Sequence, residues 1–351
     1  AQIRSIELAG IEGVDLILGS KEKFFLFDYE QDFVKKGKPV IIVSDFSEED
    51  IAIESFSSTE ERTRAFLKVQ DGCDYKCSYC TIPMTRGKSR SLSPETIEKN
   101  IIEIASRGFK EVVITGVNVS DYGKKVGSDF YNLLKRIDKI KDIPRIRISS
   151  IEPDNLKENI IELIASSERI CKHFHIPLQS GDDEILKSMQ RRYNTGQFRK
   201  IVELILKRMP KAGLGFDVIT GFPMETKEHF ENTFDFLRDT DFNYLHVFSF
   251  SPRPGTKAAG MKNVSTPQEV EKRSQKLRAL AARKKISFLN SNIGKVYDVL
   301  IEESEKNGEL FGFTDNYIRV AVKKDDRLIN NIVPVVLDKV VEEHCIGKVV
   351  S

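Results

Sequence analysis

Tryptophan is absent from the 351-residue sequence, and cysteine, methionine and histidine occur only five times each. No apolar run approaches the roughly 20 residues of a membrane-spanning helix. The densest run, at residues 332–337, has the length of a strand. The start of the chain also carries no signal-peptide pattern. We therefore expect no membrane partner.

Positive and negative charges nearly balance, since the sequence has 55 Lys and Arg and 53 Asp and Glu. This balance excludes a globally basic nucleic-acid-binding protein but leaves room for a local basic patch. The hydrophobic share of 40% is enough for packed cores, and the length suits two or three domains. Five cysteines, an odd number in a long chain, argue against a disulfide scaffold and for a reducing compartment. We therefore expect a cytoplasmic protein.

The middle of the chain alternates short apolar segments with helical patterns. Ser93 and Pro94, for example, form a helix start in which Ser is the N-cap and Pro the first helical residue. The expected strands are residues 66–70, 111–115, 145–149, 172–178, 214–220 and 243–250. Strands that alternate with helices predict a parallel α/β architecture, either a partial barrel or a doubly wound sheet. Polar residues gather in the loops after the strands, where barrel folds place their sites.

The two ends of the chain differ from this middle part. A short strand is expected within residues 13–19, and a Ser-, Thr- and Glu-rich linker at residues 47–64. A basic helix is expected at residues 267–290. Short β-rich runs follow at residues 296–301, 317–322, 332–336 and 340–341, and they predict a small β-barrel or sandwich. We expect three domains, at residues 1–60, 61–286 and 287–351.

Three of the five cysteines lie within eight positions, as Cys73-x3-Cys77-x2-Cys80. Three thiolates in one short loop suit an iron–sulfur cluster or another soft metal site. Structural zinc normally takes four protein ligands, so a zinc site here would need a distant histidine. The loop itself contains no fourth cysteine or histidine. Cys171 and Cys345 have the character of isolated thiols.

This loop, with the aromatic Tyr79 directly before its last cysteine, resembles the radical S-adenosylmethionine (SAM) superfamily. Other segments resemble the methylthiotransferase branch of that superfamily: residues 69–73, 81–83 with 86–87, 176–181, 221–226 and 251–256. Residues 86–91 and 149–153 most resemble the members of the branch that modify threonylcarbamoyladenosine in tRNA. The resemblance implies a partial (β/α)6 radical SAM barrel, a partial N-terminal α/β domain and a small C-terminal β-domain of the TRAM type.

The resemblance also implies a reaction. A 4Fe–4S cluster with one open iron binds SAM and cleaves it to a 5′-deoxyadenosyl radical, which removes the hydrogen from position 2 of the adenine. A methylthio group, made with a methyl from another SAM, then replaces that hydrogen. The implied substrate is threonylcarbamoyladenosine at position 37 of tRNA, in the anticodon stem-loop. The implied electron donor is a protein such as flavodoxin or ferredoxin.

Two alternatives for the function stay open at this stage. The first is a methylthiotransferase that acts on isopentenyladenosine in tRNA or on an aspartate of a ribosomal protein. The second is a non-catalytic zinc protein that binds RNA.

The sequence departs from the family in its first part. The family holds a second 4Fe–4S cluster with three cysteines of the N-terminal domain, whereas no cysteine precedes Cys73 here. Residues 1–2 and 11–19 resemble the stretch that follows the last of those cysteines. We expect that the first part of this domain is missing from the sequence, and with it the ligands of the second cluster.

The resemblance assigns roles to individual residues. Cys73, Cys77 and Cys80 are the expected ligands of the cluster. The expected SAM-binding residues are Tyr79 near the adenine, Gly116 and Asn118 near the methionine amine, Ser149, Gln179, Arg192 toward a carboxylate, and Asp217. His173 and His175 share one strand face, and we expect them to be packed and hydrogen-bonded rather than ligands. The tail and the helix around residues 272–285 are expected to bind RNA phosphates.

Overall fold

Six parallel strands form the central sheet of the computed structural model, which describes residues 1–32, 34–35, 37–45, 56–57 and 63–350. These strands are β4 (Arg64–Asp71), β6 (Glu111–Gly116), β7 (Arg145–Ile148), β8 (His173–Gln179), β9 (Gly213–Thr220) and β10 (Tyr244–Ser249). β4, β6 and β7 pair side by side, as do β8, β9 and β10. Isolated bridges, Ile146 to Ile170 and Ser150 to His175, connect the two groups. The result is the open partial barrel that the sequence predicts.

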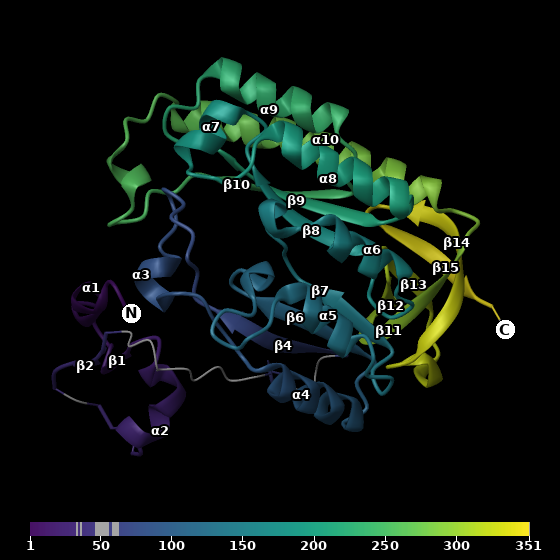
Figure 1. The fold of residues 1–351 in the computed structure, drawn as a ribbon, viewed down its shortest axis with the longest axis horizontal. Coiled ribbons are helices and arrows are strands. Elements are labelled where there is room, and N and C mark those ends of the chain that lie inside the picture. The colour runs from purple at the N-terminus through teal and green to yellow at the C-terminus, as the bar shows by residue number, and fades with distance from the viewer. Residues whose placement is uncertain (33, 36, 46–55, 58–62, 351) are drawn as a thin grey trace.

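Helices cover the outer side of these strands (Figure 1). They are α4 (Pro94–Ser106), α5 (Phe130–Ile137), α6 (Glu158–Ser166), α7 (Asp183–Ser188), α8 (Thr195–Arg208) and α9 (Lys227–Asp239). The short helix α3 (Ile82–Arg86) lies apart from them, beside the N-terminal segment. The Ser93 side chain accepts a hydrogen bond from Thr96 N, so α4 begins with the expected cap. α6 begins at Glu158, after a separate 3-10 turn at residues 153–155.

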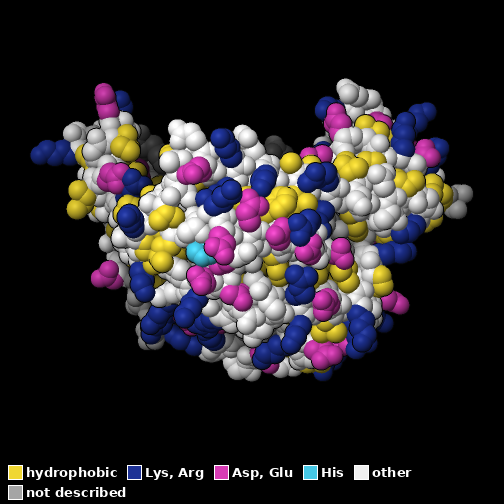
Figure 2. Space-filling view, turned by 90° about the horizontal axis from the view of Figure 1, so that it is seen from above, with side chains coloured by type: hydrophobic (Ala, Val, Ile, Leu, Met, Phe, Trp, Pro, Cys, Tyr) yellow, Lys and Arg dark blue, Asp and Glu magenta, His cyan; other side chains and the backbone are white. Residues whose placement is uncertain are grey.

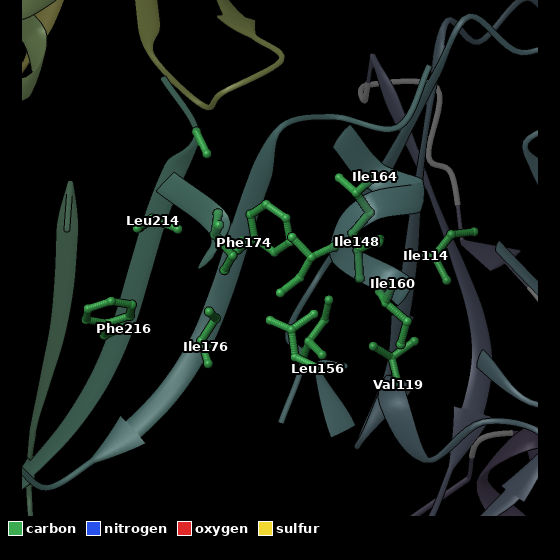
Figure 3. Close-up of a cluster of buried hydrophobic side chains, with 14 of the residues drawn as sticks. Ile114, Val119, Ile148, Leu156, Ile160, Ile164, Phe174, Ile176, Leu214 and Phe216 are labelled. Carbon is green, nitrogen blue, oxygen red and sulfur yellow. The ribbon is translucent and has the colours of Figure 1, made fainter. Parts of the chain in front are cut away.

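The main hydrophobic core lies between the sheet and the outer helices. Phe174 and Ile176 of β8 are fully buried there, in one cluster with Phe216 of β9 and Ile160 of α6 (Figure 3). Successive side chains of a strand point to opposite faces. The neighbouring residues on each strand, such as His175, therefore face the inside of the half-barrel.

The C-terminal residues form a second, closed barrel. After α10 (Pro267–Ser291), the strands run in the order β11-β12-β13-β15-β14. Their bounds are β11 (Val296–Lys306), β12 (Glu309–Thr314), β13 (Arg319–Lys323), β14 (Ile332–Val341) and β15 (His344–Val349). The predicted small β-domain is therefore a barrel and not a sandwich. No helix in the described part of the chain, α10 included, combines the length and apolarity of a membrane crossing.

Two strands of this barrel were not predicted, and each contains a glycine at a close contact. A Cβ at Gly312 of β12 would lie 2.3 Å from Leu300 O, and one at Gly347 of β15 would lie 2.3 Å from Val335 Cγ1. Glycine weakens the strand signal in a sequence, although here it lets neighbouring strands approach. The two expected runs 332–336 and 340–341 are parts of one strand, β14.

The N-terminal segment is small and lies at the opposite end of the molecule from the C-terminal barrel (Figure 1). It consists of α1 (Ser5–Ala9), β1 (Leu16–Leu18), α2 (Leu26–Tyr29) and β2 (Val40–Ile42), with β1 and β2 parallel. Ser20 Oγ donates to Thr85 O at 2.8 Å and so connects this segment to α3. The linker expected at residues 47–64 lies mostly outside the described residues. Within it, β3 (Phe56–Ser57) pairs with β4.

A buried ion pair joins the half-barrel to the C-terminal barrel. Arg147 Nε lies 2.8 Å from Glu111 Oε1, and the two side chains are 3% and 0% exposed. The same guanidinium donates to Thr314 O and Asp315 O, both at 3.0 Å. Nearby, Gly213 has no side chain, and a Cβ there would lie 2.1 Å from Asn316 O. The C-terminal barrel therefore packs on the amino ends of the parallel strands.

Replacement of Arg147 should destabilise the protein strongly. The variant Arg147→Met removes both guanidinium hydrogen bonds to the buried Glu111 carboxylate and leaves it Arg145 at 3.8 Å. Removal of one partner of a buried ion pair costs about 3–5 kcal/mol, and Arg145 should keep the loss near the lower value. We expect a correspondingly lower free energy of unfolding in chemical denaturation. The double variant Glu111→Gln/Arg147→Met also removes the carboxylate charge and should recover part of the lost free energy of unfolding. Equal stability of wild type and Arg147→Met would contradict this role of the ion pair.

Candidate functional site

The three clustered cysteines lie on the loop that follows β4. Gly72 begins the loop with a φ of +70°, and a Cβ there would lie 2.0 Å from Lys88 O, so only glycine fits this turn. Cys73 N donates to Gly87 O at 3.1 Å. The Asp71 carboxylate at the strand end forms ion pairs with Arg86 at 3.1 Å and Arg90 at 2.8 Å. These contacts hold the loop against the segment after α3.

Each of the three sulfurs has an N–H donor directed at it. Tyr75 N lies 3.4 Å from Cys73 Sγ, and Ile82 N lies 3.5 Å from Cys80 Sγ. The third donor is Arg191 Nη1, 3.1 Å from Cys77 Sγ. Such N–H donors stabilise negative charge on sulfur, as they do around iron–sulfur clusters.

Burial opposes the charged form of these thiols. It raises the pKa of Cys73 to about 11, and the neighbouring Cys77 and Cys80 add to this rise. Burial likewise raises the pKa of Cys77, against the effect of Arg191. A bound cation that requires thiolates would therefore supply the energy of deprotonation.

The spacing of the sulfurs bears on the kind of metal group. Zinc binds thiolates at about 2.3 Å, so sulfurs on one zinc ion lie within about 4 Å of one another. Within the described residues, the donor group that converges to within 4.8 Å is His175, Asp217 and His246, and it contains no cysteine. The three cysteine sulfurs are thus not all within 4.8 Å of one another.

Arg191 is the central cation of the site, and the sequence analysis missed it. Its side chain is 2% exposed and pairs with Glu152 Oε2, while its Nε donates to Tyr193 OH at 3.1 Å. The predicted residue, Arg192, is exposed and lies over the Tyr75 ring, 3.9 Å from the ring centroid. The sequence contains two adjacent arginines after α7, and only the geometry of this turn decides which one points at Cys77.

A second missed residue, Gln70, connects the cysteine loop to the end of β6. Gln70 Oε1 accepts from Asn118 N at 2.9 Å, and its Nε2 donates to Gly72 O at 2.8 Å. Gly116 leaves room for this contact, since a Cβ there would lie 2.8 Å from Gln70 Oε1. Asn118 Nδ2 is buried and has no hydrogen-bond partner in the described part of the chain. The Asn118 side chain also lowers the pKa of the neighbouring Cys73, so this free donor points toward the cysteine loop.

The remaining predicted residues occupy different places. Tyr79 lies edge-on to Phe222 at 6.4 Å and packs with the apolar cluster around α7. Gln179 ends β8 with a φ of +66°, a backbone conformation that is uncommon outside glycine. Ser149 follows β7 and lines the interior of the half-barrel. Asp217 lies in the middle of β9.

Asp217 binds two histidines on the neighbouring strands. Its Oδ1 lies 2.9 Å from His175 Nε2 and 3.1 Å from His246 Nδ1. Burial alone would raise the pKa of Asp217, but the hydrogen bonds from His175 and His246 outweigh it and bring the pKa to about 2. The carboxylate is therefore ionised at neutral pH.

A chamber of about 970 Å³ opens between the inner face of the half-barrel, α10 and the C-terminal barrel. Tyr317, with a φ of +70°, stacks on Phe313 at 4.9 Å and on His173 at 4.5 Å. His173 Nε2 lies 2.8 Å from Tyr244 OH. Gly215 makes room for the Tyr244 ring, because a Cβ there would lie 1.9 Å from Tyr244 Cζ. Aromatic rings thus continue from the C-terminal barrel into the half-barrel.

Basic side chains line the same chamber: Arg64, Arg147, Arg278, Lys285 and Arg319. Basic and aromatic groups together suit an unpaired nucleic-acid strand, whose phosphates need cations and whose bases stack on rings. Only part of the expected basic helix contributes. Lys276 of α10 pairs with Glu231 at 3.0 Å, and basic and acidic side chains are interspersed over the helical face in Figure 2.

The chain was compared with known proteins. Residues 67–237 match the radical SAM superfamily, and residues 290–350 match the TRAM domain. A threonylcarbamoyladenosine tRNA methylthiotransferase (MtaB) of Aquifex aeolicus is 36% identical over 91% of this chain and 77% of its own length. The protein of the same name from Rickettsia prowazekii is 40% identical over 89% of this chain and 72% of its own length.

Two further matches are a second tRNA-modifying enzyme and a solved structure. A tRNA-2-methylthio-N(6)-dimethylallyladenosine synthase of Bacillus subtilis is 37% identical over 84% of this chain and 59% of its own length. Among solved structures, the radical SAM methyltransferase TsrM of Kitasatospora setae gives a TM-score of 0.48 at 17% identity, over 55% of this chain and 35% of its own. On the identity and coverage of the first relatives, this chain belongs to the radical SAM methylthiotransferase family.

Proposed function

We propose that this protein converts threonylcarbamoyladenosine at position 37 of tRNA, in the anticodon stem-loop, to its 2-methylthio derivative. The observation that carries the proposal is the loop of three cysteines at the carboxyl end of β4, with an N–H donor on each sulfur. The choice of substrate rests on the relatives from Aquifex aeolicus and Rickettsia prowazekii, whose names include this nucleoside. We take the protein to act in the cytoplasm.

The family uses a 4Fe–4S cluster and SAM, and the residues present fit both. Cys73, Cys77 and Cys80 would hold the cluster, which supplies an electron that splits SAM and so generates a radical able to take hydrogen from the adenine. The free Nδ2 donor of Asn118 suits an acceptor atom near the cluster. The glycine at 116 lets a ligand approach the backbone there.

Other residues of this chain would orient the reactants. Ser149 and Gln179, at the ends of β7 and β8, would face SAM, and the exposed Arg192 remains available to a carboxylate. Tyr79, packed beside the apolar cluster, would border the adenine of SAM. Asp217 is hydrogen-bonded to His175 and His246.

The chamber would receive the tRNA. A base inside a stacked helix cannot reach a buried reactive group, so the target base must first be turned out of its stack. The stacked rings of Tyr317 and Phe313 would border the unstacked bases, while Arg319 and Lys285 offer charge for phosphates. A flavodoxin or ferredoxin would deliver the electron. No cysteine precedes Cys73, so residues 1–72 offer no thiolate to a second cluster.

Removal of the three cysteines should abolish SAM cleavage. Reconstituted under anaerobic conditions with iron and sulfide, the wild type should form 5′-deoxyadenosine from SAM and dithionite. The triple variant Cys73→Ala/Cys77→Ala/Cys80→Ala should bind no cluster and form none. Cys345→Ala, which changes a cysteine in the core of the C-terminal barrel, is the matched control and should keep the iron content. Cleavage of SAM by the triple variant would overturn the assignment of the ligands.

The tRNA of a deletion strain should identify the substrate. Mass spectrometry of digested tRNA should show threonylcarbamoyladenosine without its methylthio group, while methylthio-isopentenyladenosine stays at its normal level. The opposite pattern would assign the enzyme to isopentenyladenosine. A colourless protein that contains zinc and leaves both nucleosides unchanged would support the RNA-binding alternative instead.

The adjacent arginines after α7 provide a matched pair of variants. Arg191→Gln removes the donor on Cys77 Sγ, and changes beside a metal ligand typically lower affinity or activity about 10–100-fold. We expect a loss of this size in SAM cleavage and a changed electron paramagnetic resonance spectrum of the reduced cluster. Arg192→Gln, one position along and exposed, should leave the spectrum unchanged. Identical spectra for wild type and Arg191→Gln would show that Arg191 does not act on the cluster.

A further inference from the structure

We propose that His175, Asp217 and His246 bind a divalent metal ion on the inner face of the half-barrel, apart from the cysteine loop. One donor atom of each residue, His175 Nε2, Asp217 Oδ1 and His246 Nδ1, lies within 4.8 Å of the other two. The ion belongs to the class that accepts imidazole and carboxylate together, of which zinc is the representative.

The register of three adjacent strands creates the site. His246 of β10 pairs directly with Asp217 of β9, and Asp217 pairs with Pro177 of β8. His175 is two residues before Pro177 and so lies on the same face of the sheet. The side chains that point the other way, such as Phe174 and Phe216, are fixed in the core. Ligands on strands of a packed sheet are held in place more firmly than ligands on loops.

The charges around the site favour a cation. Asp217 has the two histidines as its ion-pair partners, and in the described part of the chain no Lys or Arg pairs with it. Basic groups that line the chamber have acidic partners of their own, Arg147 with Glu111, Arg64 with Glu302 and Arg278 with Glu271. The carboxylate thus faces the inside of the half-barrel without a permanent positive partner.

The ligand set leaves room for further ligands. Three protein ligands are one fewer than a closed structural zinc site uses, and sites with an open position bind water or substrate there. His246 is 54% exposed and lines the chamber, so water or an anionic oxygen can reach the ion from that side. A metal would displace the protons that His175 Nε2 and His246 Nδ1 now donate to Asp217 Oδ1.

The competing explanation is a hydrogen-bonded brace without any ion. In that case both histidines donate to one oxygen of Asp217 and no metal is retained. The sequence predicts such a hydrogen-bonded role for His175. It does not show that Asp217 of β9 and His246 of β10 are the neighbours of His175. The two explanations differ in a measurable quantity, bound metal per chain.

The experiment measures zinc on protein whose cysteine loop already carries its cluster, so that the thiols do not compete. Cluster-loaded wild type is dialysed anaerobically against buffered free zinc, and bound zinc is determined by mass spectrometry of the elements. We expect one zinc per chain. His246→Gln and, independently, His175→Gln should weaken zinc binding at least 100-fold. Because bound zinc is measured, the result does not depend on the proposed tRNA substrate.

The control variant is His229→Gln, which changes a histidine on α9 that is bonded to Glu184. It should bind zinc like wild type. Iron content establishes that each variant keeps its cluster and fold, and zinc should raise the melting temperature of wild type but not of His246→Gln. Absence of zinc from wild type, or equal zinc in wild type and both site variants, would overturn the proposal.

Discussion

The inner face of the half-barrel consists of alternate residues of six parallel strands, and every functional group described above depends on this constraint. Parallel strands end at a common rim, so the loop after β4 and the turn before α8 meet there. Because of this alternation, Phe174 and Phe216 point into the core between sheet and helices. His175 and Asp217 point to the other face, inside the half-barrel. A shift of one residue in any of these strands would exchange core and interior completely.

The constraint separates two kinds of chemistry along the axis of the half-barrel. At the rim, half-buried sulfurs are surrounded by N–H donors, an environment that suits soft metals and electron transfer. In the middle of the strands, imidazole and carboxylate groups face an open chamber. At the amino ends, the C-terminal barrel closes the chamber with Tyr317 and Phe313. A strand of RNA that enters the chamber would therefore meet rings and cations before it reaches the rim.

The sequence predicted this architecture well where the signal is local. Strands and helices alternate with clear caps such as Ser93, and the cysteine spacing is distinctive in itself. The strands β12 and β15 escaped prediction because Gly312 and Gly347 serve close contacts between strands. The contact of Arg191 with Cys77 could not be predicted, because two adjacent side chains on one turn point in different directions. The partnership of Asp217 with His246 depends on strand register, which no local pattern encodes.

Tyr317 links the shape of a loop in the C-terminal barrel to the half-barrel. Its backbone is held in a left-handed conformation that is unfavourable for a tyrosine. The ring is stacked on Phe313 of its own barrel and on His173 of the half-barrel. The loop thus takes its shape partly from a neighbour that belongs to another domain. A C-terminal barrel moved onto another half-barrel would therefore lose one of the two rings that hold this loop, unless the start of β8 with His173 came with it.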